Sequence, residues 1–120
     1  MKKKIKIKVG IDSPVAAGAG TISKLIAKNY KLLYLDTGKI YRFMARQIID
    51  KKPKDKLKFL KKISRNINLN KLKQRNLLND DVAYLASQIA KDIKVRNLVV
   101  RFQRRLAYHP PNKYNGSILD

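Results

Sequence analysis

The most constraining feature of this sequence is a run of small residues between two segments of different hydrophobic period. Apolar and polar residues alternate over residues 5–11, which is the period of a strand with one buried face. Residues 13–20 are only Ser, Pro, Val, Ala and Gly, and from Thr21 to about Tyr30 the apolar residues recur at helical spacing. Strand, small-residue turn and helix in this order predict the start of a parallel α/β sheet.

The rest of the chain continues this pattern. In order, it predicts a strand at 32–35, a helix at 40–48, a linker at Pro53, helices near 57–63, 82–89 and 95–106, and a third strand at 117–120. Residues 66–79 have no clear period. A parallel sheet that stopped at a third strand would have a poorly covered edge, so we expect the fold to continue beyond residue 120.

The charge of the chain is strongly positive, with 29 Lys and Arg residues against 8 Asp and Glu and a formal net charge of +21. Such a charge attracts polyanions and suggests a nucleic-acid binder. The alternative is a base-composition bias, because the excess is mainly lysine, is spread along the chain, and accompanies many Ile and Asn residues with A/T-rich codons. The densest stretch, residues 51–62, also fits a solvated helix. We therefore expect no dedicated nucleic-acid surface.

Composition excludes several other classes. The chain has no cysteine, which excludes a disulfide scaffold, a thiolate metal site and a cysteine nucleophile. No apolar run approaches the roughly 18 residues of a membrane span, and the basic start lacks the apolar core of a secretory signal. We expect a cytoplasmic protein that does not associate with membranes.

The turn at residues 13–21 has the context of a phosphate-binding loop. Small residues there let backbone N–H groups converge on phosphates at a helix N-terminus, and a Ser or Thr hydroxyl binds Mg²⁺. Gly18, Gly20 and Thr21 fit these roles. Ser13 stands where the pattern has its first glycine, and Ala19 stands where it has the lysine that reaches the β- and γ-phosphates. A tight turn with no ligand is the alternative on this motif alone.

Several separated blocks resemble bacterial cytidylate kinases in that family's order. They are residues 12–21, 33–38, Tyr41-Arg42, 86–90, Val95-Arg96 and 102–105, with 117–120 similar to the strand before the family's Gly-Arg-Asp motif. The resemblance implies a P-loop nucleoside monophosphate kinase fold, with a parallel sheet flanked by helices. It also implies that residues 1–120 are the N-terminal portion of one kinase domain whose C-terminal part is absent, and that residues 51–79 are a short helical substrate-binding insert.

In that family, the γ-phosphoryl group of ATP passes to CMP or dCMP with the help of Mg²⁺. The resemblance implies that the ATP phosphates are held by Ser13, Pro14, Val15, Ala16, Ala17, Gly18, Ala19, Gly20 and Thr21. It implies that Mg²⁺ is held by Thr21 and Asp120. It implies that CMP is bound by Asp36, Thr37, Gly38, Arg42, Ser87 and Arg96.

Each of these residues also has a structural alternative. Arg42 and Arg96 could be surface arginines, although a guanidinium suits a phosphate or the acceptor edge of a base. Ser87 could bond to a backbone carbonyl of its own helix. Residues 36–38 could be a turn that ends a strand, and Asp120 an acid without a role. We expect Tyr41 to pack rather than bind, and we assign no role to His109, the single histidine.

The absent P-loop lysine bears on mechanism, because phosphoryl transfer depends on neutralising charge on the γ-phosphate oxygens. Losing one such group costs about 2.7–4 kcal/mol by analogy with an oxyanion-hole donor. Lys24, one turn beyond Thr21, is a candidate replacement, as are Lys8 and an arginine of the family's lid.

We therefore expect a cytidylate kinase that uses ATP and Mg²⁺, acts on small molecules and is monomeric when complete. The 120 residues alone are expected to show no CMP phosphorylation above background. One alternative is a non-catalytic, basic nucleic-acid-binding or regulatory fragment on a decayed nucleotide-binding fold. Another is a different nucleoside monophosphate kinase, or a shikimate kinase, with the same loop.

Overall fold

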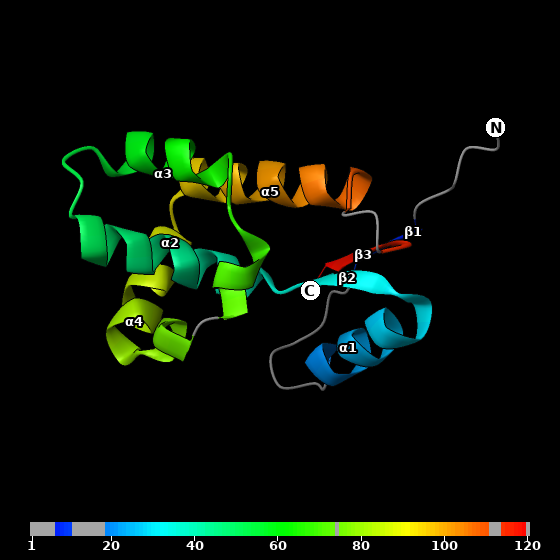
Figure 1. Cartoon of the computed structure of the whole chain (residues 1–120). Helices are drawn as coiled ribbons and strands as arrows, with labels where there is room; N and C mark the ends of the chain where they lie inside the picture. Colours follow the sequence, from blue (N-terminus) through cyan, green and yellow to red (C-terminus); the bar gives the residue numbers. More distant parts are fainter. Residues whose placement is uncertain (1–6, 11–18, 74, 111–113, 120) are drawn as a thin grey trace. The chain divides into compact units, whose positions relative to one another are not determined.

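The computed structural model describes residues 7–10, 19–73, 75–110 and 114–119. The chain forms two compact units, one from residues 1–36 and 103–120 and the other from residues 37–102. The first unit contains β1 (Ile7–Gly10), α1 (Ala19–Tyr30), β2 (Leu32–Leu35), β3 (Gly116–Leu119) and the last part of α5 (Ile93–Tyr108) (Figure 1). The described residues are thus mostly helical with a small sheet, as the α/β expectation requires.

The sheet is parallel throughout, with strand order β1-β3-β2. Val9 and Tyr34 both lie opposite Ile118, which is fully buried on the central strand. Each strand lies within one or two residues of its predicted position. The third strand is the centre of the sheet, and its edges are β1 and β2.

Helix α1 packs on this sheet through a small apolar cluster. Ala27, Leu32 and Ile118 are its buried members, with Val9, Ile26 and Tyr34 against them. The helix begins at Ala19, two residues before the predicted start, and is followed by Lys31 in a left-handed conformation with φ 53°. Asn115 fastens the helix end to the segment before β3, because its N–H donates to the Lys31 carbonyl (2.8 Å) and its side chain to the Tyr30 carbonyl (3.1 Å).

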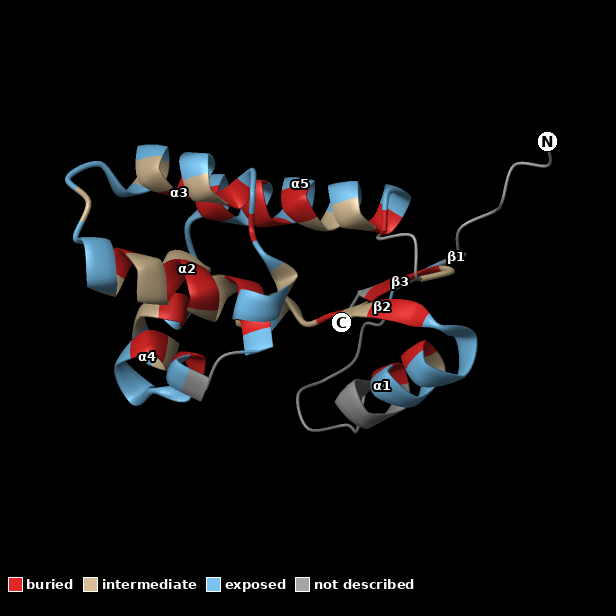
Figure 2. Cartoon of the chain, in the orientation of Figure 1, coloured by how far each residue is buried: buried red, intermediate tan, exposed pale blue. Residues whose placement is uncertain are grey.

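The second unit is helical. It contains α2 (Thr37–Lys51), α3 (Lys56–Ser64), the short 3₁₀ helices η1 (Leu69–Lys73) and η2 (Arg75–Leu78), α4 (Asp80–Ile89) and the first part of α5. Helices α2 and α4 pack together through buried Ala45, Val82 and Ala86 (Figure 2). The 3₁₀ helices occupy most of residues 66–79 and explain why that stretch has no α-helical period.

Two side chains fix where helices of this unit begin. The Asp55 carboxylate accepts the Lys58 N–H (3.0 Å) at the start of α3, and the Asn79 amide oxygen accepts the Asp81 N–H (2.9 Å) at the start of α4. Helix α2 ends before Lys52 (φ 47°) and Pro53, as the predicted linker requires. Within the described residues, none of the helices combines the length and the apolar character that crossing a bilayer needs.

Candidate functional site

The predicted phosphate-binding turn has its expected neighbours. Strand β1 ends at Gly10 and helix α1 begins at Ala19, so Ala19, Gly20 and Thr21 form the first turn of that helix. The first N–H groups of a helix lack intrahelical acceptors and lie at its positive end, which suits phosphate oxygens. Residues 13–18 and Asp120 lie outside the described residues, so their predicted roles stay predictions.

The candidate replacements for the P-loop lysine lie over aromatic rings in this structure. Lys24 Nζ is 5.8 Å from the centroid of the Tyr34 ring, and Lys8 Nζ is 4.7 Å from that of Tyr108. Both side chains are largely exposed. A cation over a ring gains about 0.5–1 kcal/mol at an exposed site, which is too little to prevent a lysine from turning to a phosphate.

The predicted substrate residues of the second unit lie on three of its helices. Thr37 and Gly38 begin α2, half-buried Arg42 lies one turn further along it, Ser87 lies on α4, and Arg96 lies on the first turn of α5. Asp36 directly follows β2 in the first unit.

Tyr41 connects these three helices, and this role goes beyond the packing predicted for it. Its ring lies against the cluster of Ala45, Val82 and Ala86 that joins α2 to α4. Its phenol oxygen accepts a hydrogen bond from the guanidinium of Arg96 on α5. Burial raises the pKa of the Tyr41 phenol above 10.0, and the positive charge and hydrogen bond of Arg96 oppose that rise. The phenol is therefore neutral at physiological pH and accepts the hydrogen bond of Arg96 in that form.

The predicted substrate residues of this unit lie on the three helices that Tyr41 connects. Arg42 directly follows Tyr41, Ser87 directly follows Ala86 of the apolar cluster, and Arg96 bonds to the phenol itself. Sequence reasoning missed the contact between Tyr41 and Arg96, because the two residues belong to helices far apart in the chain.

Ser87 makes the backbone contact that was its structural alternative. Its hydroxyl donates to the Tyr84 carbonyl one turn earlier at 2.6 Å, and its side chain is exposed. A hydroxyl has one hydrogen to donate and two acceptor lone pairs. Once the hydrogen is used within the helix, the oxygen of Ser87 offers only acceptors to a ligand.

The second unit thus combines a guanidinium bonded to a half-buried phenol, a second arginine, and an exposed oxygen acceptor. Comparison with known proteins identifies the group to which such a chain belongs, since a family model described as cytidylate kinase matches residues 9–116. The chain belongs to the cytidylate kinase family.

Curated cytidylate kinases agree with this assignment. The protein from Sinorhizobium medicae is 40% identical over 113 residues, covering 93% of this chain and 51% of that relative. The protein from Rhizobium meliloti is 36% identical over the same shares, and that from Paramagnetospirillum magneticum is 36% identical over 93% of this chain and 53% of its own length. The chain therefore spans about half the length of the curated cytidylate kinases it matches.

Proposed function

We propose that this chain supplies the CMP-binding helices and the ATP phosphate loop of an ATP-dependent kinase that converts CMP or dCMP to CDP or dCDP. In that reaction a phosphate oxygen of the nucleotide forms a bond to the γ-phosphorus of ATP, and the bond to ADP breaks. The observation that supports the proposal is the Tyr41 junction, because Tyr41 of α2 packs against α4, which carries Ser87, and bonds to Arg96 of α5.

The two arginines serve the monophosphate and the cytidine. A guanidinium presents several donors in a fixed plane, and such a fork suits a phosphate or the acceptor edge of a base. Arg96 is exposed yet bonded to a half-buried phenol, so it loses less side-chain freedom on binding than an unattached surface arginine. The phenol is therefore a positioning group for Arg96.

Ser87 serves the base. Cytosine presents an amino donor at the position where uracil presents a carbonyl acceptor. With its hydrogen donated to the Tyr84 carbonyl, the Ser87 oxygen can accept from cytosine, whereas donating to uracil would require that bond to break. This hydrogen bond favours CMP over UMP.

The donor set at the start of α1 fits an ATP phosphate chain with Mg²⁺. Backbone N–H groups of the first turn would hold the phosphates, and the Thr21 hydroxyl belongs to the hard oxygen ligands that Mg²⁺ prefers. When bound, Mg²⁺ neutralises charge on the phosphate oxygens. Asp120 would support the metal through water, and Lys24 would supply the charge that Ala19 lacks, since it lies one helical turn beyond Thr21.

Calorimetric titration of the chain with CMP tests the monophosphate site. Arg96→Gln should weaken CMP binding at least tenfold, because a hydrogen bond to a charged group contributes about 1.5–3 kcal/mol. The matched control is Arg101→Gln, an exposed arginine on the same helix with no proposed role. Equal CMP affinity in the two variants would contradict the proposal.

A further inference from the structure

Helix α3 carries its positive charges as a stripe along one face. Lys58, Lys61, Lys62 and Arg65 recur at the i, i+3, i+4 and i+7 positions, which lie on the same side of a helix. The opposite side is buried at Leu60 and Ser64. Among the described residues, the other exposed lysines lie on several elements.

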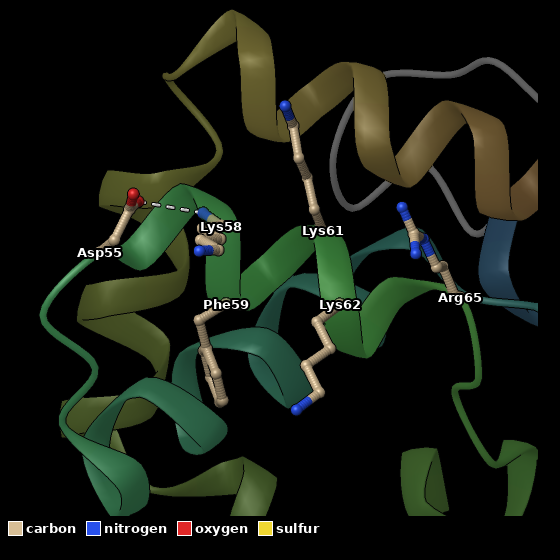
Figure 3. Close-up of a pocket in the computed structure, with 6 residues that line it drawn as sticks. All are labelled: Asp55, Lys58, Phe59, Lys61, Lys62 and Arg65. Atoms are coloured by element: carbon tan, nitrogen blue, oxygen red, sulfur yellow. Dashed lines mark hydrogen bonds between the residues drawn. The ribbon is translucent and has the colours of Figure 1, made fainter.

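An open hollow of about 470 Å³ lies on this face. Its lining residues are Asp55, Lys58, Phe59, Lys61, Lys62 and Arg65 (Figure 3). The Phe59 ring and the Lys62 side chain extend to one side of the helix, and Lys61 extends to the other. The lining therefore combines an aromatic ring with cations that extend to both sides of the helix.

Little on this helix balances the charge. Asp55 is the single acidic residue of residues 51–65, and its carboxylate is occupied in capping the helix through the Lys58 N–H. Within the described part of the chain, the ammonium groups of Lys58, Lys61 and Lys62 form no ion pair with a carboxylate. Like charges one turn apart destabilise a helix, and an anion bound along the stripe would relieve that repulsion.

We propose that the outer face of α3 binds single-stranded RNA, with backbone phosphates along the lysine stripe and a base against the Phe59 ring. A positively charged track beside an aromatic platform is the chemistry that proteins use for single strands. A lipid surface fits less well. Interfacial helices insert several large apolar side chains, whereas the half-buried Phe59 is the one large apolar residue among those that line the hollow.

This proposal does not rest on the kinase function: none of the single residues assigned to CMP or ATP lies on α3, although α3 belongs to the predicted substrate-binding insert at residues 51–79. The proposal also predicts a different distribution of RNA affinity from the one that a base-composition bias predicts. A bias would spread RNA affinity over all lysines in proportion to charge, whereas a site concentrates it on α3.

Fluorescence anisotropy of the chain with a labelled uridine oligonucleotide at several salt concentrations tests the site. The triple variant Lys58→Gln, Lys61→Gln, Lys62→Gln should flatten the slope of log K against log salt by about 2, because each lysine on a single-strand phosphate contributes about 0.7. The control carries Lys28→Gln, Lys91→Gln and Lys94→Gln, three exposed lysines on other parts of the chain. It has the same charge change and should retain the wild-type slope.

Three results would overturn the proposal. Equal loss of slope in both triple variants would assign RNA binding to the charge of the whole chain. If the chain binds inorganic polyphosphate as tightly as the oligonucleotide, the base does not contribute to binding. If the chain binds phosphatidylserine vesicles through α3 and does not bind RNA, this face binds a membrane. If the triple variant does not fold by circular dichroism, the single variants Lys61→Gln and Lys62→Gln should each flatten the slope by about 0.7.

Discussion

At the scale of single residues, Tyr41 connects the helices that carry the proposed site. Tyr41 is partly buried against the apolar contact of α2 with α4, and its oxygen is the acceptor for Arg96. A surface arginine samples many rotamers, and the bond to a fixed phenol reduces that freedom before any ligand arrives. The same side chain thus contributes to packing and to the position of a charged group.

Tyr41→Phe separates these two contributions, since it keeps the ring and removes the oxygen. We expect about fivefold weaker CMP binding, corresponding to about 1 kcal/mol for one hydrogen bond. The control is Tyr84→Phe, whose ring is exposed on α4 and should leave CMP affinity unchanged. Titration calorimetry measures both variants. Unchanged CMP affinity in Tyr41→Phe would mean that the phenol does not position Arg96.

The ionisation of Tyr41 predicts how stability changes at high pH. Because burial raises the pKa of this phenol in the folded chain, the unfolded chain releases the proton first as pH rises. The contribution of the neutral phenol is complete below the ordinary pKa of 10.0 and is lost as pH rises through the folded value.

Urea unfolding at about pH 9 and about pH 11 checks this expectation. The wild-type chain should lose more free energy of unfolding over this interval than Tyr41→Phe does. The lysines titrate in both proteins, so the difference between the two reports Tyr41. Equal losses would show that the phenol has the same pKa in the folded and unfolded chains.

At the scale of elements, the caps and turns decide where the site residues lie along their helices. Asn79 ends the 3₁₀ segment and starts α4, which carries Ser87 on its exposed side and buries Val82 and Ala86. A Ser, Asp or Asn at this position satisfies an N–H group that the helix itself cannot.

Asn79→Ala should lower the free energy of unfolding by about 1 kcal/mol, since it leaves the Asp81 N–H without its side-chain acceptor. Asn79→Asp is the matched variant, because a carboxylate restores the acceptor and favours the positive end of the helix. Urea denaturation of the two should differ by about that amount. Equal free energies of unfolding for the two variants would show that the Asn79 cap does not stabilise α4.

The hydrophobic period of the sequence predicted most elements, because the spacing of apolar residues within a segment reflects the secondary structure of that segment. Helices α1 to α5 each carry apolar residues at helical spacing, β1 alternates apolar and polar residues, and β2 is a short apolar run. Residues 66–79 were not predictable, since a 3₁₀ helix has a period of three and too few residues to establish it. Which strand is central depends on pairing between distant segments, and period alone does not encode it.

The members of the candidate site are still predictions, and the contacts that two of them make could not be predicted from the sequence. Arg42, Ser87 and Arg96 were identified by blocks similar to a known family. The hydrogen bond from Arg96 to Tyr41 depends on how α5 meets α2, and the donation from Ser87 to the Tyr84 carbonyl depends on one rotamer. Neither contact can be predicted from the order of residue types in the sequence.

At the scale of the whole molecule, the chain has two units with different assigned chemistry. The unit with the sheet carries the start of α1 beside the predicted phosphate loop, and the helical unit carries the junction around Tyr41. The chain spans about half of the curated cytidylate kinases it matches, with 51% of the Sinorhizobium medicae protein covered. Nucleotide binding therefore tests the residues of this chain more directly than a measurement of catalytic turnover does.

We propose that the helical unit recognises cytidine monophosphate through residues around Tyr41. Amide NMR spectra of the chain, titrated with CMP and then with UMP, test this recognition. We predict that CMP shifts the amides near Arg42, Ser87 and Arg96 together, and that UMP binds more weakly and shifts the amide of Ser87 least. If CMP leaves these three regions unperturbed, or if CMP and UMP shift them equally, the account of this site is wrong.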